Sequence, residues 1–255
     1  MIKLSNISAG YNKVEVIKHI NIGFEEGTIT SVIGKNGCGK TTLLRVASNL
    51  LKPLSGSVTI VGKEISSIPS KELARKVAFL PQIRTVPNIT VNNLVMHGRY
   101  PYLDFSRTPQ KKDKEIVERA IEIMGLEDIK SKNIHELSGG QRQKVYLAMV
   151  LAQDTDIIFL DEPTTYLDIN HQLEILEVIK KLKMLGKTIV MVLHDLNSAL
   201  SCSDRVCLMD DGEIVIYDTP QDVFESGEID RIFKVCSSQV PIEGELTKQY
   251  VFYLK

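Results

Sequence analysis

The 255-residue chain is long enough for one large domain or for a domain with an inserted subdomain. Its hydrophobic content of 43% and charged content of 25% are ordinary for a globular protein, and a net charge of −1 argues against a strongly basic nucleic-acid surface. The longest apolar run, Val145–Ala152, is far shorter than the roughly 18 residues of a membrane helix. We expect no secretory signal, and four cysteines without a CxxC pair favour a reducing, cytosolic location.

The first eighty residues show mainly β patterns. Apolar residues alternate from Ile2 to Ile7 and again from Val14 to Phe24, which predicts antiparallel strands. Helical character over Lys40–Leu51 ends before Pro53. The other expected strands of this region are Thr28–Ile33, Val58–Val61 and Val77–Leu80.

From about Thr90 to Gln153 the pattern is helical, with no convincing strand. Strands are expected again on either side of one helix, which places Leu173, Leu176, Ile179 and Leu182 on one face, and a hairpin follows around Asp211-Gly212. These later strands are Ile157–Leu160, Thr188–Leu193, Val206–Met209 and Ile214–Tyr217. The sequence therefore predicts an α/β core interrupted by a helical segment.

A complete GxxxxGK[ST] phosphate loop follows the strand Thr28–Ile33 and begins a helix. Its residues are Gly34-Lys35-Asn36-Gly37-Cys38-Gly39-Lys40-Thr41. Glycines let backbone N–H groups surround phosphate oxygens at the positive end of the helix. In such a loop Lys40 reaches the β- and γ-phosphates and the Thr41 hydroxyl coordinates Mg²⁺. A chance glycine-rich turn is the alternative, but the strand before the loop and the helix after it favour phosphate binding.

Two carboxylates, Asp161 and Glu162, end the apolar run Ile157–Leu160. Ligands bind at the carboxyl ends of strands in open α/β sheets. We expect Asp161 to hold Mg²⁺ through water, and Glu162 to orient and deprotonate an attacking water. The alternative is a pair of solvated loop acids before Pro163.

The segment Leu137-Ser138-Gly139-Gly140-Gln141 has two compatible interpretations. Ser138 and Gln141 have the spacing of a capping box, a common way to start a helix. Capping does not require the two glycines between them, whereas an anion site that backbone approaches closely does.

In their order and spacing, GKNGCGKTT, LSGGQ and IIFLDEP resemble the nucleotide-binding subunit of an ABC (ATP-binding cassette) transporter over nearly the whole chain. The resemblance implies nucleotide contacts along Gly34–Thr42, including Thr42. It implies adenine stacking on Tyr11, a Gln82 that contacts Mg²⁺ and the lytic water and senses the membrane partner, and a γ-phosphate contact from His194. It further implies a homodimer in which the partner's ATP meets five residues: Ser138, Gly139, Gly140, Gln141 and Asp168.

The implied fold is a P-loop NTPase core (1–82 and 156–255) with an antiparallel β subdomain and an inserted all-helical subdomain (83–155). Three further segments resemble ATPases of iron–siderophore, haem and vitamin B12 importers: Met96–Tyr102, Met149–Asp154 and Leu167–Gln172. The first contains Gly98-Arg99-Tyr100-Pro101, where this subfamily contacts its permease. The implied protein uses ATP and Mg²⁺ at the cytoplasmic face of the membrane, with a permease and, indirectly, a substrate-binding protein.

Other interpretations stay open from the sequence. An ABC exporter ATPase for lipids or drugs shares all the hydrolytic motifs, and only the segment Gly98–Pro101 speaks against it. ABC ATPases of DNA repair or ribosomes usually carry two cassettes or a long coiled coil, and near-neutral charge disfavours nucleic-acid binding. Cys38 lies near a helix N-terminus, which can lower a thiol pKa, but we expect a passive small residue.

Overall fold

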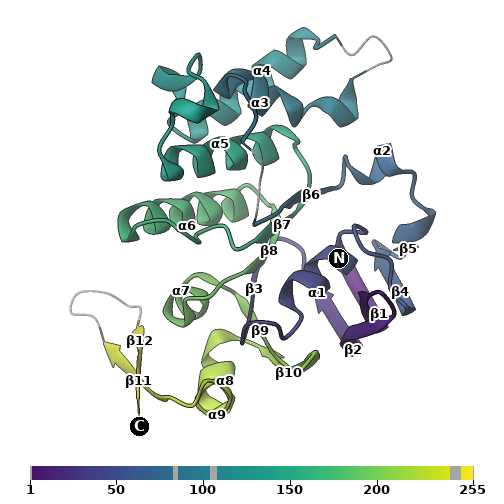
Figure 1. Ribbon diagram of the computed structural model, residues 1–255, viewed down its shortest axis with the longest axis vertical. Helices are drawn as coiled ribbons and strands as arrows, with labels where there is room; N and C mark the ends of the chain where they lie inside the picture. The colour runs from purple at the N-terminus through teal and green to yellow at the C-terminus, as the bar shows by residue number, and fades with distance from the viewer. Residues whose placement is uncertain (1, 83–85, 104–107, 242–247, 255) are drawn as a thin grey trace. The chain divides into compact units, whose positions relative to one another are not determined.

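The computed structural model describes residues 2–82, 86–103, 108–241 and 248–254 (Figure 1). The chain divides into two compact units. The first unit combines Met1–Ile68 with Lys183–Lys255, and the second is Pro69–Leu182. The helical subdomain expected at 83–155 lies within the second unit, and as a functional division it stays a prediction.

The first unit contains a mainly parallel sheet centred on a completely buried strand, β3. β8 and β9 both run parallel to β3, and β10 turns back along β9 as the expected hairpin. Across the unit the order is β10 (Glu213–Asp218), β9 (Arg205–Asp210), β3 (Ile29–Gly34) and β8 (Thr188–Val192). Helices α1 (Lys40–Ala47) and α7 (Leu196–Cys202) pack against β3, which explains why its apolar run does not alternate.

A second, antiparallel sheet in the first unit confirms the strands expected from alternating residues. Its order is β2 (Val14–Phe24), β1 (Ile2–Tyr11), β4 (Ser55–Ile60) and β5 (Lys63–Glu64). The N–H of Lys18 on β2 donates to the carbonyl of Gly212, 2.9 Å away in the β9–β10 turn. A Cβ on Gly212, whose φ is +84°, would lie 2.4 Å from the Val16 carbonyl oxygen, so the two sheets meet where only glycine fits.

The end of the first unit holds elements that the sequence pattern did not predict. They are α8 (Pro220–Glu225), α9 (Glu228–Phe233) and a hairpin of β11 (Cys236–Pro241) with β12 (Lys248–Tyr253). The ring of Tyr250 lies 5.0 Å from that of Phe224 on α8, and its N–H donates to Asn197 on α7. The hairpin is therefore anchored by contacts far along the chain.

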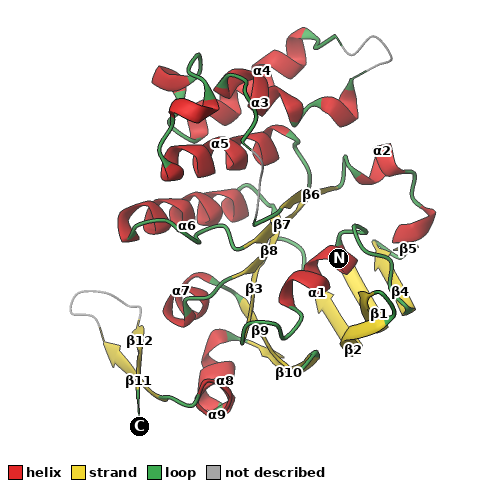
Figure 2. Ribbon diagram, in the orientation of Figure 1, coloured by secondary structure: helices red, strands yellow, loops and turns green. Residues whose placement is uncertain are grey.

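The second unit holds the expected helical segment (Figure 2). α3 (Val91–His97), α4 (Lys111–Ile123) and α5 (Gly139–Ala152) pack against one another. Within the described part of 90–153 there is no strand, only an isolated bridge between Thr90 and Asn133. The remaining elements of this unit are α2 (Ser70–Leu73), the parallel strands β6 (Val77–Leu80) and β7 (Ile157–Asp161), and α6 (Ile169–Met184).

Two helices differ in detail from expectation. α1 ends at Ala47 rather than Leu51, because Ser48 donates its hydroxyl to the Leu44 carbonyl and Asn49 adopts a left-handed φ of 62°. On α6 the expected apolar face includes Leu173, but that side chain is 54% exposed while Leu176, Ile179 and Leu182 are buried. Among the described residues, no helix is both long and apolar enough to cross a membrane.

Candidate functional site

The phosphate loop occupies the turn between β3 and α1 in the first unit. Gly34, Gly37 and Gly39 have φ of 149°, 82° and 102°, a region that side chains rarely adopt. A Cβ on Gly34 would lie 2.3 Å from the Met209 carbonyl oxygen of the neighbouring strand. The loop thus has the backbone curvature that phosphate binding needs. Its first position, Gly34, requires glycine because β9 approaches so closely.

Lys40 points back into its own loop. Its Nζ donates to the carbonyls of Gly34, 2.8 Å away, and Lys35, 2.9 Å away, and the residue is only 6% exposed. These carbonyls hold an ammonium group inside the turn where backbone N–H groups can gather around an anion. The geometry fits a phosphate-binding role for Lys40.

Tyr11 and His194 belong to the same unit as the phosphate loop. The Tyr11 ring is 41% exposed, and its hydroxyl accepts a hydrogen bond of 3.1 Å from Arg45 on α1. His194 is exposed and follows the carboxyl end of β8, which pairs in parallel with β3. The unit therefore places an aromatic ring beside the helix of the phosphate loop, and a histidine at the sheet edge where that loop begins.

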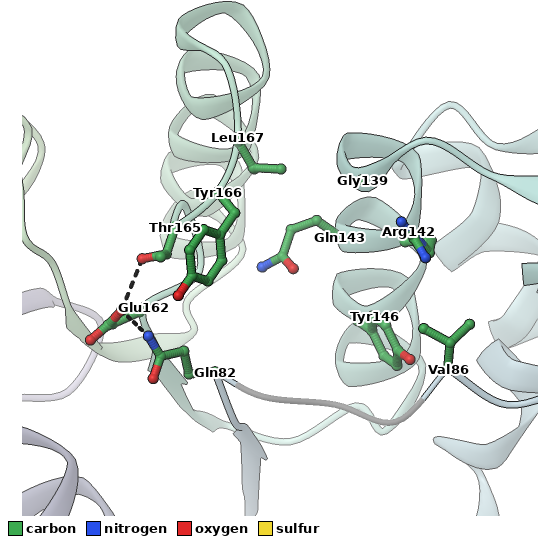
Figure 3. A pocket seen from close by; sticks show the side chains of 10 residues that line it. All are labelled: Gln82, Val86, Gly139, Arg142, Gln143, Tyr146, Glu162, Thr165, Tyr166 and Leu167. Carbon is green, nitrogen blue, oxygen red and sulfur yellow. Dashed lines mark hydrogen bonds between the residues drawn. The ribbon is translucent and has the colours of Figure 1, made fainter. Parts of the chain in front are cut away.

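Gln82 and Glu162 come together in the second unit. Leu80 pairs with Leu160 in the parallel β6–β7 ladder, so each residue lies two positions beyond its strand's paired end. Gln82 Nε2 donates to Glu162 Oε2, and Thr165 Oγ1 donates to the same oxygen at 3.0 Å (Figure 3). Glu162 has a φ of 54°, a left-handed value that residues with a side chain adopt infrequently.

Asp161 is the last residue of β7 and is 2% exposed. A buried carboxylate needs partners or a cation. The Asp161 carboxylate and the Gln82 amide oxygen in the second unit, and the Thr41 hydroxyl in the first, are all oxygen donors of the kind that Mg²⁺ prefers. Their donor chemistry therefore fits a magnesium ion.

The expected capping box at the start of α5 is confirmed. Ser138 Oγ accepts from the Gln141 N–H at 3.2 Å, and Gln141 Oε1 accepts from the Ser138 N–H at 3.1 Å. Ser138 and Gly139 are exposed, whereas Gly140 is buried. The helix start thus leaves backbone donors accessible, as an anion site requires.

Asp168 caps the next helix, α6. Its Oδ1 accepts from the His171 N–H at 3.0 Å, and both carboxylate oxygens lie 2.8 Å from His171 Nδ1. The backbone hydrogen bond from His171, followed by the side-chain one, lowers the pKa of Asp168. Asp168 is therefore an exposed, ionised carboxylate at neutral pH.

A cavity of about 230 Å³ lies between the start of α5 and the loop after β7 (Figure 3). Gln82 and Glu162 are at one side of it and Gly139 at the other. Tyr146 and Tyr166 contribute aromatic rings to its wall. The candidate base and the LSGGQ segment therefore border one open cavity within the second unit.

The surroundings of Cys38 favour the passive role over the reactive one. Burial raises the pKa of this thiol and outweighs the opposing effect of Lys40. The expected passive role agrees with a residue that is 5% exposed.

The segment Gly98–Pro101, which is expected to meet a permease, is only partly exposed. Arg99 is 3% exposed, whereas Tyr100 is 55% exposed and stacks on His97 with ring centroids 4.6 Å apart. Tyr100 is thus the most exposed residue of this segment.

Sequence reasoning assigned no role to Thr165, His171, Arg45 or Gln143. His171 lies inside the segment Leu167–Gln172 quoted for the resemblance, and Thr165 lies two residues before it, but what they contact depends on folding. The Gln143 amide donates to the carbonyl of Pro163, twenty positions away. Arg45 likewise has its partner, Tyr11, far along the chain, whereas Thr165 and His171 hydrogen-bond to residues three positions before them.

Comparisons with known proteins agree with this geometry. A family model described as "ABC transporter" matches residues 17–165. The chain is 44% identical to the "Probable siderophore transport system ATP-binding protein YusV" of Bacillus subtilis (strain 168) over 95% of this chain and 90% of that protein. It is 41% identical to the ferric enterobactin transport ATP-binding protein FepC of Escherichia coli (strain K12), over 89% of this chain and 84% of that protein.

Among solved structures, the bacterial ABC transporter cassette MJ0796, described as dimeric, superposes with a TM-score of 0.75 and 29% identity. The match covers 86% of this chain and 99% of that one. The expected fold, an α/β P-loop core with an antiparallel β part and a helical insertion, is confirmed. The chain belongs to the ABC transporter family and is one of its nucleotide-binding ATPase subunits.

Proposed function

We propose that this chain hydrolyses ATP to drive the import of an iron–siderophore or related metal chelate through a separate membrane permease. The observation that carries the catalytic part is the hydrogen-bonded group of Gln82, Glu162 and Thr165 at the ends of β6 and β7. The names of relatives that act in siderophore and ferric enterobactin transport support the substrate class.

In this proposal the phosphate loop binds the phosphates through its backbone N–H groups and Lys40. Tyr11 stacks on adenine. Thr41, Gln82 and Asp161 would hold Mg²⁺, which would supply positive charge against the phosphates.

Glu162 orients the attacking water and takes its proton, with Gln82 as the neighbouring group that positions the same water. The left-handed φ of Glu162 and the donor from Thr165 fix where the carboxylate points. His194, at the carboxyl end of β8, contacts the γ-phosphate and stabilises the charge that develops on it.

Two copies of the chain form the working enzyme in this proposal. Ser138, Gly139, Gly140, Gln141 and Asp168 of one copy meet the ATP held by the other. The exposed capped start of α5 supplies the donors, and the dimeric structure of a related cassette supports the arrangement. One chain alone then contains two half-sites.

The partner at the membrane is a permease whose cytoplasmic surface meets the exposed Tyr100 and its neighbours. Gln82 follows the end of β6 in the same unit and hydrogen-bonds to Glu162. A movement of Gln82 on permease binding therefore changes the position of the Glu162 carboxylate. The chain then works at the cytoplasmic face of the membrane, and a substrate-binding protein delivers the chelate to the permease.

Hydrolysis is tested with the Glu162→Gln variant. We expect ATP binding to persist, turnover to fall by at least a hundredfold, and a stable ATP-bound dimer to appear in size-exclusion chromatography. Glu213→Gln, an exposed residue on β10, is the matched control and should hydrolyse ATP like the parent. Normal turnover in Glu162→Gln would reject Glu162 as the base.

The substrate class is tested by deleting the gene in its own organism and measuring uptake of ⁵⁵Fe bound to catecholate and hydroxamate siderophores. We expect energy-dependent uptake of at least one chelate to be lost, and to return with the wild-type gene but not with Glu162→Gln. Undiminished uptake of every chelate, including haem and cobalamin, would reject import of this class.

A further inference from the structure

The first turns of α5 and α6 lie against each other at an unusually close contact. A Cβ placed on Gly140 would be 2.3 Å from Cδ2 of His171 and 2.8 Å from its Nε2. Non-bonded carbon atoms are best separated by about 3.5–4.0 Å. The imidazole ring therefore occupies the volume that a side chain at position 140 would need.

The ring cannot easily leave that place. Its Nδ1 lies 2.8 Å from both carboxylate oxygens of Asp168, and the His171 N–H donates to the same carboxylate. Asp168 in turn begins α6, so its position is tied to the helix. Rotating the imidazole away from Gly140 would break its hydrogen bond to Asp168.

Two further links join the same segments. Lys144 Nζ lies 2.7 Å from Glu174 Oε2, and Gln143 donates to the carbonyl of Pro163. Positions 140, 143 and 144 share one face of α5, and 171 and 174 share one face of α6. One face of the LSGGQ helix α5 therefore contacts both the loop after β7 and the first turns of α6.

We propose that His171 is a positioning residue that joins the LSGGQ segment and the Asp168 loop into one moving body. The proposal rests on the proposed function, in which both segments reach the nucleotide of the second chain. His171 itself does not contact the nucleotide in this proposal. Its ring packs beside Gly140 and hydrogen-bonds to Asp168, so a displacement of one displaces the other. When ATP draws the LSGGQ segment towards it, the Asp168 loop moves with it.

The contact itself is tested by a thermal-unfolding cycle without nucleotide. Alanine normally stabilises a helix relative to glycine, yet Gly140→Ala should lower the midpoint temperature by several degrees because of the His171 ring. In the His171→Ala background the same change should be neutral or stabilising. Gly139→Ala is the matched control, since a Cβ there meets nothing within 4 Å and its effect should not depend on residue 171.

The positioning role is tested by ATPase kinetics at a temperature where every variant is folded. His171→Ala should lower kcat at least tenfold and leave KM for ATP within twofold, because the phosphate loop is unchanged. His171→Asn keeps a donor near the Nδ1 position but lacks the ring, and it should recover part of kcat. In the Gly140→Ala background, His171→Ala should raise kcat instead of lowering it.

Wild-type kcat and KM in His171→Ala, or additive shifts in the unfolding cycle, would overturn the proposal. Failure of the wild-type chain to hydrolyse ATP would instead reject the proposed function. The unfolding cycle would then still decide whether Gly140 and His171 join the two segments.

Discussion

Nε of Arg99 lies 2.9 Å from Oδ1 of Asp113, and both residues are more than 90% buried. Asp113 also accepts the Gln110 N–H in the capping box of α4, and Arg99 Nη1 donates to the carbonyl of Ala152 at the end of α5. The Arg99 guanidinium lies 3.8 Å from the centroid of the Tyr102 ring. One ion pair therefore connects the ends of three helices behind the exposed Tyr100.

Asp113→Ala should lower the free energy of unfolding by about 3–5 kcal/mol, because it leaves the Arg99 charge buried and unpaired. The double variant Arg99→Met with Asp113→Leu should lose less, since it removes both charges together. Urea unfolding followed by circular dichroism measures both. Glu115→Ala on the same helix, where the carboxylate pairs with an exposed Lys111, should change stability by no more than about 0.5 kcal/mol. A double variant as unstable as Asp113→Ala would contradict this account.

Gly98→Ala should also destabilise the helical segment. A Cβ at this position would lie 2.2 Å from the Met149 carbonyl oxygen and 2.9 Å from the Gln153 nitrogen, both backbone atoms of α5 or its end. Because backbone cannot rotate aside as a side chain can, we expect a loss of about 1–3 kcal/mol in urea unfolding. Gly98 follows the last residue of α3 and has the right-handed φ of −56°, which alanine adopts without strain. A stabilised variant would therefore show that α3 and α5 separate at little cost.

The strands and motifs of this chain could be predicted because their signals are local. The glycines of the phosphate loop and the apolar run before Asp161 are contiguous in sequence, and each carries its own geometric requirement. The hairpin β11–β12 could not be predicted in the same way. Its stability depends on Asn197 and Phe224, which lie far from Tyr250 along the chain.

The candidate site likewise contains residues that the sequence identifies and contacts that only the fold reveals. Glu162 and Gln82 could be named from sequence, but the donor from Thr165 depends on the turn after β7. From the sequence, glycine at position 140 is expected because it lets the backbone approach an anion closely. In the folded chain the ring of His171, thirty-one positions further on, fills the space beside it.

Thr165→Val should lower kcat for ATP roughly tenfold, a part of the 10²–10⁴ that a general base contributes. The change removes the hydroxyl that donates to Glu162 Oε2 but keeps the shape of the side chain. KM for ATP should stay within twofold, because the change leaves every residue of the phosphate loop unaltered. Steady-state phosphate release measures both constants.

Thr165→Ser is the matched control, since it keeps the hydroxyl and loses only a methyl group. It should retain most of the wild-type kcat. Equal losses in Thr165→Val and Thr165→Ser would show that packing rather than the hydrogen bond explains the effect.

Cys38 should react slowly with maleimides in the folded chain. The thiolate is the reactive form, and burial raises the pKa of Cys38, so at neutral pH its thiolate fraction is below that of an ordinary cysteine. The rate should rise as pH rises through the ordinary thiol pKa of about 8.5, and continue to rise above it. Cys207, fully buried and with a pKa also raised by burial, should react more slowly still.

Timed labelling with N-ethylmaleimide at pH 7 and pH 9, followed by mass spectrometry of the peptides, gives the rate at each cysteine. The partly exposed Cys202 and Cys236 serve as internal references and should be modified first. In urea all four rates should converge, because the differences come from the fold. A Cys38 that is modified at pH 7 faster than either reference would mean that the helix N-terminus and Lys40 outweigh burial, and that the thiol is activated after all.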